Sequence, residues 1–405
     1  MRMRRRSILV LLVVWLVLSA ASSWCTIQAW ALGATGPVVF VSNLAWIINL
    51  PGWVVVHLVP GMGRRTEPGV IIAANAIGWG LWIIAGVALV WMRSWLHSKW
   101  VTPEAPSTLA VPSRRAFLTN STLGSIAICA AAAPGYATLI EPWSVKVRRY
   151  RIPIEDLPGS LDGLRIVQVS DTHLGPRIPE SFIEGVYQQA MDLKPDLVFL
   201  TGDHVHDGVR EHERAAELCK PLVDSTPMGV VGVLGNHDWW GDGDALTRLL
   251  EGAGVRMIDN DRLWIDPVNR SLTRVDTGIP SLAVVGLGDL TDSKIRTRQA
   301  FRDVGVSTPR LVLAHNPDTA EIGPLISSQG PRVDLMFSGH THGGQVRIPF
   351  LGTPIVPSRY GQRYAGGLVD GPAFRVCVSR GVGMSMLPVR VGVPPEISEI
   401  TLVCS

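Results

Sequence analysis

Side chains of the kinds that bind metal ions follow a series of short apolar runs in the last two-thirds of the chain. Most of these polar blocks place a glycine beside a histidine, aspartate or asparagine. One such residue often does no more than cap a strand, but seven or eight of them together are not explained by capping. The blocks are Asp171-Thr172-His173, Gly202-Asp203-His204, Gly235-Asn236-His237-Asp238, His315-Asn316 and Gly339-His340-Thr341-His342.

The apolar runs that precede these blocks have the length and composition of buried strands. They are continuous rather than alternating, which is typical of strands covered on both faces. A helical pattern over 179–193 separates the first two runs, and strands that alternate with helices favour an α/β sheet. Because sites of open α/β sheets form beyond the carboxyl ends of the strands, we expect the polar blocks to converge there. The runs are 164–169, 196–200, 230–234, 282–285, 311–314 and 335–338.

The ligand types narrow the choice of metal. Imidazole, carboxylate and amide oxygen without thiolate suit divalent Mn, Fe, Zn or Ni, and argue against Cu(I) and iron–sulfur clusters. The set is larger than one ion can use, so we expect two divalent ions that share a carboxylate. Two ions about 3.5–4 Å apart can generate hydroxide and hold the oxygens of a phosphoryl group during its displacement. The predicted ligands are Asp171, His173, Asp203, Asn236, His315, His340 and His342.

A two-metal site of this kind also needs an acid for the leaving group. His237 directly follows the candidate ligand Asn236 and directly precedes Asp238. It therefore has the position of an acid at the rim of the metal pair, with a carboxylate beside it to orient and charge the ring.

In their order these blocks resemble the calcineurin-like metallophosphoesterase family, over residues 146–405. The resemblance implies a four-layer α/β/β/α sandwich with two sheets face to face, whereas the strand runs alone support only α/β or α+β. It implies that Asp203 bridges the two ions, that His237 is the acid and that Asp238 is its partner. The ligand sets that it implies are Asp171, His173 and His342 for one ion and Asn236, His315 and His340 for the other.

The segments 315–318, 339–345 and 379–383 look more like one bacterial branch of the family. Members of that branch are often membrane-anchored or exported by the twin-arginine route. They include enzymes similar to the pyrophosphatases that act on UDP-2,3-diacylglucosamine in lipid A synthesis. We therefore expect a phosphorylated substrate, and a lipid-linked diphosphate is one candidate.

The chain departs from the family pattern at one position. The family commonly has Gly-Asp, two further residues and an Asp, whereas this chain has His206 at the acidic position. The Asp203 bridge is unaffected. The departure affects the residues around the ligands, which orient the ligands and can shift the metal preference. Asp207 is a candidate replacement, and we expect neither His204 nor His206 to be a ligand.

For a few further residues, the sequence is compatible with either a substrate-binding role or a structural one. Arg347, Arg363 and Arg380 are candidates to pair with a substrate phosphate, since guanidinium groups bind phosphate oxygens in a bidentate way, but surface or structural arginines are commoner. The pair Trp239-Trp240 is either an apolar wall for a lipid or base, or the interior of a loop.

The first 100 residues have the composition of membrane-spanning helices. No Asp, Glu, Lys or Arg occurs over 7–63 or 68–92. Because a span needs about 20 apolar residues, we expect an all-α transmembrane region in residues 1–100. The predicted spans are 8–32, 38–59 and 70–91. A cleaved signal followed by buried soluble helices is the alternative.

A linker and weakly apolar segment, 101–144, joins this region to the predicted catalytic domain, 145–405. Within it, Ser113-Arg114-Arg115-Ala116-Phe117-Leu118 resembles a twin-arginine export signal, and a basic flank of a fourth span is the alternative. Four spans would return the domain to the cytoplasm, which the basic residues over 146–151 favour. We expect instead that the second span is incomplete, which gives a multi-pass protein of a bacterial inner membrane with an extracytoplasmic catalytic domain. The membrane and the twin-arginine translocase are then its partners.

Composition and charge exclude several other classes. The net charge is only +3 and many basic residues flank apolar segments, so we expect no nucleic-acid partner. The five cysteines include no C-x-x-C pair, which argues against a disulfide framework or a thiolate metal site. A phosphatase or phosphodiesterase acting on soluble nucleotides or phosphoproteins, and a non-catalytic metal-bound scaffold, stay open as alternatives. The scaffold is disfavoured because the acid and all predicted ligands are present.

Overall fold

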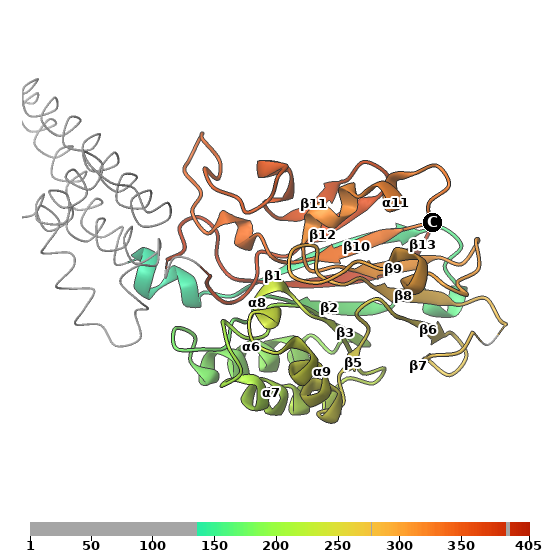
Figure 1. Ribbon diagram of the computed structural model, residues 1–405, viewed down its shortest axis with the longest axis horizontal. Coiled ribbons are helices and arrows are strands. Elements are labelled where there is room, and N and C mark those ends of the chain that lie inside the picture. Colours follow the sequence, from blue (N-terminus) through green and yellow to red (C-terminus); the bar gives the residue numbers. More distant parts are fainter. Residues whose placement is uncertain (1–135, 277, 386–388) are drawn as a thin grey trace, which may run out of the picture. The chain divides into compact units, whose positions relative to one another are not determined.

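The computed structural model describes residues 136–276, 278–385 and 389–405. The chain divides into two compact units, and nearly all described residues belong to the second, Leu139–Ser385 with Val389–Ser405. This unit contains two β-sheets with helices on their outer faces (Figure 1). The predicted α/β sandwich is thus confirmed for this unit, while the boundaries of the three predicted regions stay a prediction.

The first sheet has six strands in the order β1-β13-β2-β3-β4-β5. Four of them, β2 to β5, run parallel, β13 is antiparallel to β2, and β1 is parallel to β13. The strands are β1 (Lys146–Ile154), β2 (Arg165–Val169), β3 (Leu197–Thr201), β4 (Val230–Val233), β5 (Arg256–Met257) and β13 (Glu396–Cys404).

The second sheet has seven strands in the order β11-β12-β10-β9-β8-β6-β7. Its centre, β8, β9, β10 and β12, is parallel, and the outer strands are antiparallel to their neighbours. The strands are β6 (Arg262–Asp266), β7 (Ser271–Thr273), β8 (Leu282–Gly286), β9 (Arg310–Leu313), β10 (Leu335–Ser338), β11 (Gly367–Asp370) and β12 (Arg375–Val378). All six apolar runs of the sequence are therefore strands.

Helices cover the outer face of each sheet. On the first sheet, α6 (Glu180–Asp192) buries Ile183, Val186, Tyr187 and Ala190, a spacing that places them on one helix face. With it lie α7 (His212–Ser225) and α9 (Gly243–Gly252). The second sheet is covered by short elements: α10 (Thr297–Ala300), η3 (Pro317–Glu321), α11 (Gly323–Ile326) and η5 (Gly361–Tyr364). The remaining short helices are η1 (Glu141–Trp143), η2 (Gly159–Leu161), α8 (Asn236–Trp239) and η4 (His342–Gly344).

Burial on both faces explains why the strand runs are continuously apolar. In β2, Ile166 faces the core between the two sheets, whereas Val167 faces the core under the helices. Between the sheets, the fully buried rings of Phe199 in β3 and Phe337 in β10 meet edge to face, with centroids 5.0 Å apart. Gln168 of β2 also donates to the carbonyl oxygen of Ser338 at the end of β10, 2.9 Å away. The two sheets are thus fixed together just below the ends of their strands.

The longest strands were not predicted. The basic residues over 146–151, which supported the alternative of a fourth membrane span, lie in β1, which pairs with β13 along nine residues. Arg149 and Glu399, partners in that register, form an ion pair of 2.7 Å. Arg149 therefore contributes to the pairing of β1 with β13.

In the part of the chain that the structure describes, no helix is long and apolar enough to cross a membrane. The longest of the named helices there, α7, has 14 residues, short of the roughly 20 that a span needs. This finding contradicts the expected location, a multi-pass protein of a bacterial inner membrane with an extracytoplasmic catalytic domain, and that expectation is corrected. The three predicted spans and the twin-arginine-like segment lie in residues 1–135, outside the described residues.

We expect that removing either ring of the edge-to-face pair between the sheets lowers the stability of the fold measurably. Phe199→Ala and Phe337→Ala should each lower the free energy of unfolding by about 3–5 kcal/mol, because each leaves a cavity in a fully buried core. Val306→Ala, at a side chain that is 91% exposed, is the matched control and should change it by less than about 0.5 kcal/mol. Urea denaturation of the full chain measures all three. If the double phenylalanine variant loses the full sum of the single losses, the two rings are not coupled.

Candidate metal centre

All predicted ligands lie shortly after strands at one edge of the two sheets. Five lie in loops, and Asn236 and His342 are the first residues of the short helices α8 and η4. Backbone hydrogen bonds join these loops: the amide of Asp171 donates to the carbonyl of Gly202, and the amide of Gly339 to the carbonyl of His315, both at 2.9 Å. Between the sheets, the amide of His340 donates to Asp171 Oδ1 at 2.9 Å. The loops after β2, β3, β9 and β10 therefore converge, as the sequence predicted.

Two glycines beside the ligands are required by close packing. A Cβ atom on Gly235 would collide with the side chain of Asp203, and one on Gly339 would collide with that of Asp171. The glycines that precede Asn236 and His340 thus let ligands from neighbouring strands approach the backbone directly. This contact is the physical reason why the polar blocks contain glycine.

Five of the seven predicted ligands have an unusual backbone conformation. Their φ angles are positive, between 47° and 68°, a region that residues other than glycine seldom occupy. Strain of this kind persists only where surrounding structure enforces it, and it is concentrated at functional sites. The five residues are Asp171, His173, Asp203, His340 and His342.

One group of ligand atoms surrounds the Nε2 atom of His173. That atom lies 2.8 Å from His342 Nε2 and 3.4 Å from Asp203 Oδ2. His342 Nε2 in turn lies 3.4 Å from Asp171 Oδ1. The four residues are buried, and their ligand atoms lie within 4.8 Å of one another. This is the set that the sequence assigned to one ion together with the bridging carboxylate.

A second group forms on the other side of Asp203. Its Oδ2 atom also lies 3.3 Å from His315 Nε2. Close by, His340 Nδ1 and Asn236 Oδ1 are 2.9 Å apart. One carboxylate oxygen, Asp203 Oδ2, is therefore within reach of a histidine from each group.

The arrangement fits two divalent cations. Within the described residues, the buried atoms Asp171 Oδ2 and His315 Nε2 make no hydrogen bond. A buried polar atom without a partner costs about 1–3 kcal/mol, which a coordinated cation would offset. The donors are imidazole nitrogens, carboxylates and one amide, the set that suits divalent Mn, Fe, Zn or Ni.

Burial also prepares the histidines to bind a cation. It lowers the pKa of His173 and of His342 well below the usual value, and that of His340 to about 4. These rings are therefore neutral near pH 7, the form that coordinates metal. Burial has the same tendency at His315, but the carboxylate of Asp203 outweighs it and raises the pKa of His315. The raised pKa favours a proton on the His315 ring, and a cation beside Asp203 would take the place of that proton.

His237 lies at the start of α8, directly over Asp203. Its amide donates to Asp203 Oδ1 at 2.9 Å, and its ring Nδ1 donates to the carbonyl oxygen of His206 at 2.5 Å. Because a carbonyl only accepts, Nδ1 carries a proton and Nε2 is the atom left to exchange one. The indole of Trp240 packs on the imidazole with centroids 3.8 Å apart, while Trp239 packs against the core under the helices.

The structure does not bring the Asp238 carboxylate to the His237 ring. Asp238 instead accepts hydrogen bonds from the amides of Val205, at 3.1 Å, and Gly235, at 2.8 Å. Adjacent residues of a helix point to different sides, which explains the separation. These two hydrogen bonds of Asp238 connect the loop after β3 to the loop after β4.

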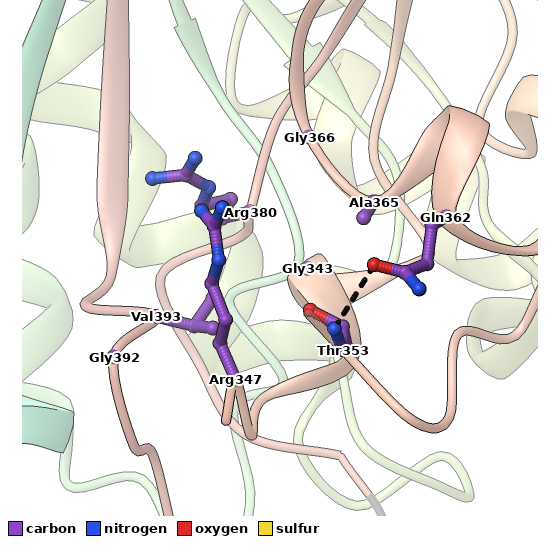
Figure 2. A pocket seen from close by; sticks show the side chains of 9 residues that line it. All are labelled: Gly343, Arg347, Thr353, Gln362, Ala365, Gly366, Arg380, Gly392 and Val393. Atoms are coloured by element: carbon purple, nitrogen blue, oxygen red, sulfur yellow. Dashed lines mark hydrogen bonds between the residues drawn. The ribbon is translucent and has the colours of Figure 1, made fainter. Parts of the chain in front are cut away.

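A cavity lies next to this centre (Figure 2). None of the seven predicted ligands lines it, but Gly343, the residue after His342, does. Two of the three arginines singled out in the sequence, Arg347 and Arg380, line it. The third, Arg363, forms an ion pair of 2.9 Å with Glu321 instead.

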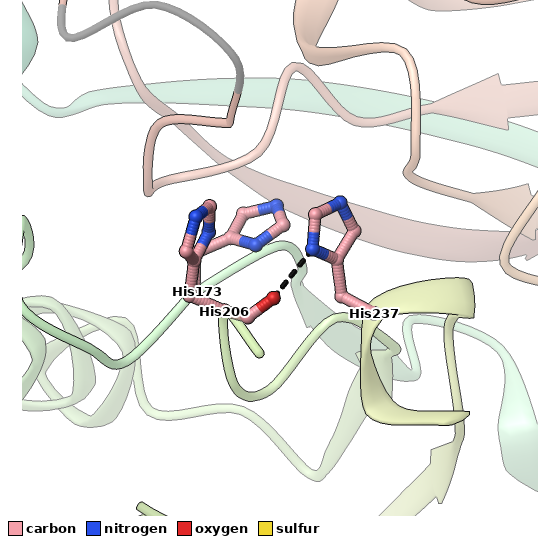
Figure 3. Close-up of side chains that lie close together, drawn as sticks. All are labelled: His173, His206 and His237. Atoms are coloured by element: carbon pink, nitrogen blue, oxygen red, sulfur yellow. Dashed lines mark hydrogen bonds between the residues drawn. The ribbon is translucent and has the colours of Figure 1, made fainter. Parts of the chain in front are cut away.

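His206 is closer to the centre than the sequence indicated. Figure 3 shows its ring beside those of His173 and His237, and one ring nitrogen from each of the three lies within 4.8 Å of the others. On its outer side, His206 Nε2 is 3.4 Å from Arg177 Nη1. The departure from the family pattern was the available signal, since it placed a ligand-type residue where an acid is usual.

Sequence reasoning missed Arg390 entirely. This arginine is fully buried, and its guanidinium donates to the carbonyl oxygens of Arg380 and Gly381, both at 3.0 Å, and of Gly383, at 2.5 Å. Gly383 in turn donates its amide to the carbonyl of Asp171 at 2.7 Å. Arg390 thus holds the loop that supports Asp171, and nothing local in the sequence marks that role.

Comparison with known proteins agrees with this geometry. A model of the calcineurin-like phosphoesterase family matches residues 164–344. The uncharacterized metallophosphoesterase YkuE of Bacillus subtilis is 32% identical over 72% of this chain and 97% of its own length. The phosphodiesterase YaeI of Escherichia coli is 30% identical over 72% of this chain and 99% of its own. The UDP-2,3-diacylglucosamine pyrophosphatase LpxG of Chlamydia trachomatis is 29% identical over 65% and 90%, respectively.

These relatives are matched along almost their whole length. The match to the family model, residues 164–344, contains all seven predicted ligands. The chain therefore belongs to the calcineurin-like phosphoesterase family of metal-dependent hydrolases.

Proposed function

We propose that this protein hydrolyses a phosphate ester or diphosphate bond at a centre of two divalent ions bridged by Asp203. The observation that carries the proposal is the position of Asp203 Oδ2, 3.4 Å from His173 Nε2 and 3.3 Å from His315 Nε2. Asp171, His173 and His342 would hold one ion, and Asn236, His315 and His340 would hold the other.

Each part of this centre has a distinct task. When bound, the two ions supply a hydroxide nucleophile and neutralise charge on the phosphoryl oxygens. His237 holds a proton on Nε2 for the leaving oxygen, because its Nδ1 proton is committed to the carbonyl of His206. Asp238 keeps the loops after β3 and β4 in place, and so acts on His237 through the backbone.

The substrate we favour is a lipid-linked phosphodiester or diphosphate such as UDP-2,3-diacylglucosamine. Two observations support it: the 29% identity to LpxG, and a group of exposed apolar side chains in the segment after the last ligand loop. Ile348, Phe350, Leu351 and Ile355 are 41%, 108%, 71% and 67% exposed. Exposed apolar groups of this size commonly mark binding surfaces. A soluble nucleotide diester is the second candidate, which the likeness to the phosphodiesterase YaeI favours.

Chelation should destabilise the protein in a way that depends on Asp203. At about 100 times the dissociation constant, bound metal adds about 2.7 kcal/mol of stability, so we expect Mn²⁺ to raise the melting temperature of the chelated protein by about 5–10 °C. Asp203→Asn should lose most of this increase. Asp224→Asn, at an exposed carboxylate near the end of α7, is the matched control and should keep it. An equal rise in wild type and Asp203→Asn would contradict the bridging role.

The proton-donating role of His237 predicts a dependence on the leaving group. His237→Ala should lower kcat by about 10²- to 10⁴-fold for an alkyl ester, whose leaving oxygen needs a proton. The loss should be much smaller for a p-nitrophenyl ester, whose leaving group departs as a stable anion. Steady-state kinetics of the Mn²⁺-loaded protein, with metal content measured in parallel, separate this role from a structural one. The same loss for both esters would leave His237 without a role as the acid.

A further inference from the structure

The cavity beside the metal centre has a positively charged and polar lining. Its volume is about 180 Å³, and its lining contains two arginines but no aspartate or glutamate. Pockets that enclose a whole small-molecule ligand are usually about 300–1,000 Å³, so this one has room for a single group of a larger substrate. In Figure 2 the side chains of Arg347 and Arg380 lie along one side, opposite Gln362 and Thr353.

The charge of this lining is only partly neutralised. Arg380 Nη1 lies 3.5 Å from Glu396 Oε2, but that same oxygen also lies 3.9 Å from Arg148 Nε. Arg347 is exposed and forms no ion pair within the described residues. The Glu396 carboxylate thus lies near two arginines, Arg380 and Arg148, and cannot neutralise both. The exposed Arg347 adds a further positive charge to the cavity lining.

The backbone around the cavity is built to accommodate Arg380. Gly343 and Gly366 both have positive φ angles, 61° and 148°, and both line the cavity. A Cβ atom on Gly343 would come within 3.2 Å of Arg380 Cγ, and one on Gly366 within 2.8 Å of it. Glycine at these two positions leaves the space that the arginine side chain occupies.

The cavity is also close to the predicted ligands. Gly343 follows His342 directly, so their Cα atoms are about 3.8 Å apart. On the other wall, Gly381 follows Arg380 and packs against the side chain of Asp171. The cavity is therefore within reach of a group attached to a phosphoryl group at the proposed metal centre.

We propose that this cavity binds a second, non-reacting phosphoryl group of the substrate through Arg347 and Arg380. The inference rests on the proposed function and extends it, since it makes two adjacent phosphoryl groups, as in a diphosphate, the preferred substrate chemistry. Guanidinium groups are suited to this task because their planar donors pair with two phosphate oxygens at once. A lipid-linked diphosphate and a soluble nucleotide diphosphate share this chemistry.

Competitive inhibition tests the proposal without requiring the natural substrate. The assay follows the hydrolysis of bis(p-nitrophenyl) phosphate by the full-length Mn²⁺-loaded protein, with UDP and UMP as inhibitors and Mn²⁺ in excess over nucleotide. We expect UDP to bind more tightly than UMP. Arg347→Ala should raise the inhibition constant of UDP by about 10- to 100-fold, the value of a charge-assisted hydrogen bond, and that of UMP by much less. Arg347→Lys, which keeps the charge but not the fork, should give an intermediate value.

Arg302→Ala is the matched control, because the Arg302 side chain is 67% exposed, pairs with Asp303 and does not line the cavity. It should change neither constant. If wild type binds UDP and UMP equally, or if Arg347→Ala weakens both to the same extent, the second phosphoryl site is wrong. If wild type with metal bound hydrolyses no phosphomonoester, phosphodiester or diphosphate, the proposed function fails. The second phosphoryl site is then tested by the binding of UDP and UMP measured by calorimetry, with the same outcomes.

Discussion

The buried carboxylate of Asp203 is the interaction on which the rest of this structure depends. An isolated carboxylate inside a protein is very costly, and only hydrogen bonds and opposite charge make it tolerable. Asp203 is 1% exposed, accepts the amide of His237 and faces a histidine on either side. Removing the partners would leave a charge without compensation. Everything around it therefore has to hold those partners in place.

The two-sheet architecture meets this requirement. Parallel strands deliver their carboxyl ends to one edge, and the contact of Gln168 with the end of β10 fixes the two edges against each other. The short loops then turn through positive φ angles so that side chains from different strands point to one place. The buried guanidinium of Arg390 donates to carbonyl oxygens of the loop that supports Asp171, and so holds that loop in place. The strain in the loops is thus balanced by hydrogen bonds that lie outside the centre.

Much of this was visible in the sequence, because the signals are local. A buried strand is a short apolar run, and a ligand loop is a polar block with glycine, so six strands, the helix α6 and the convergence of the loops were predicted correctly. The pairing of β1 with β13 was missed because its partners are about 250 residues apart and the charges of β1 imitate a membrane flank. The position of the Asp238 carboxylate depends on the direction of side chains on α8, and that of Arg390 on carbonyl oxygens of a distant loop. Neither leaves a pattern in the sequence.

The number and spacing of the bound metal ions test most directly whether Asp203 bridges two of them. A crystal structure of the Mn²⁺-loaded protein, with anomalous scattering to locate manganese, measures both directly. The account predicts two ions per chain about 3.5–4 Å apart, with Asp203 in contact with both. A single ion, or two ions of which Asp203 contacts only one, would contradict it.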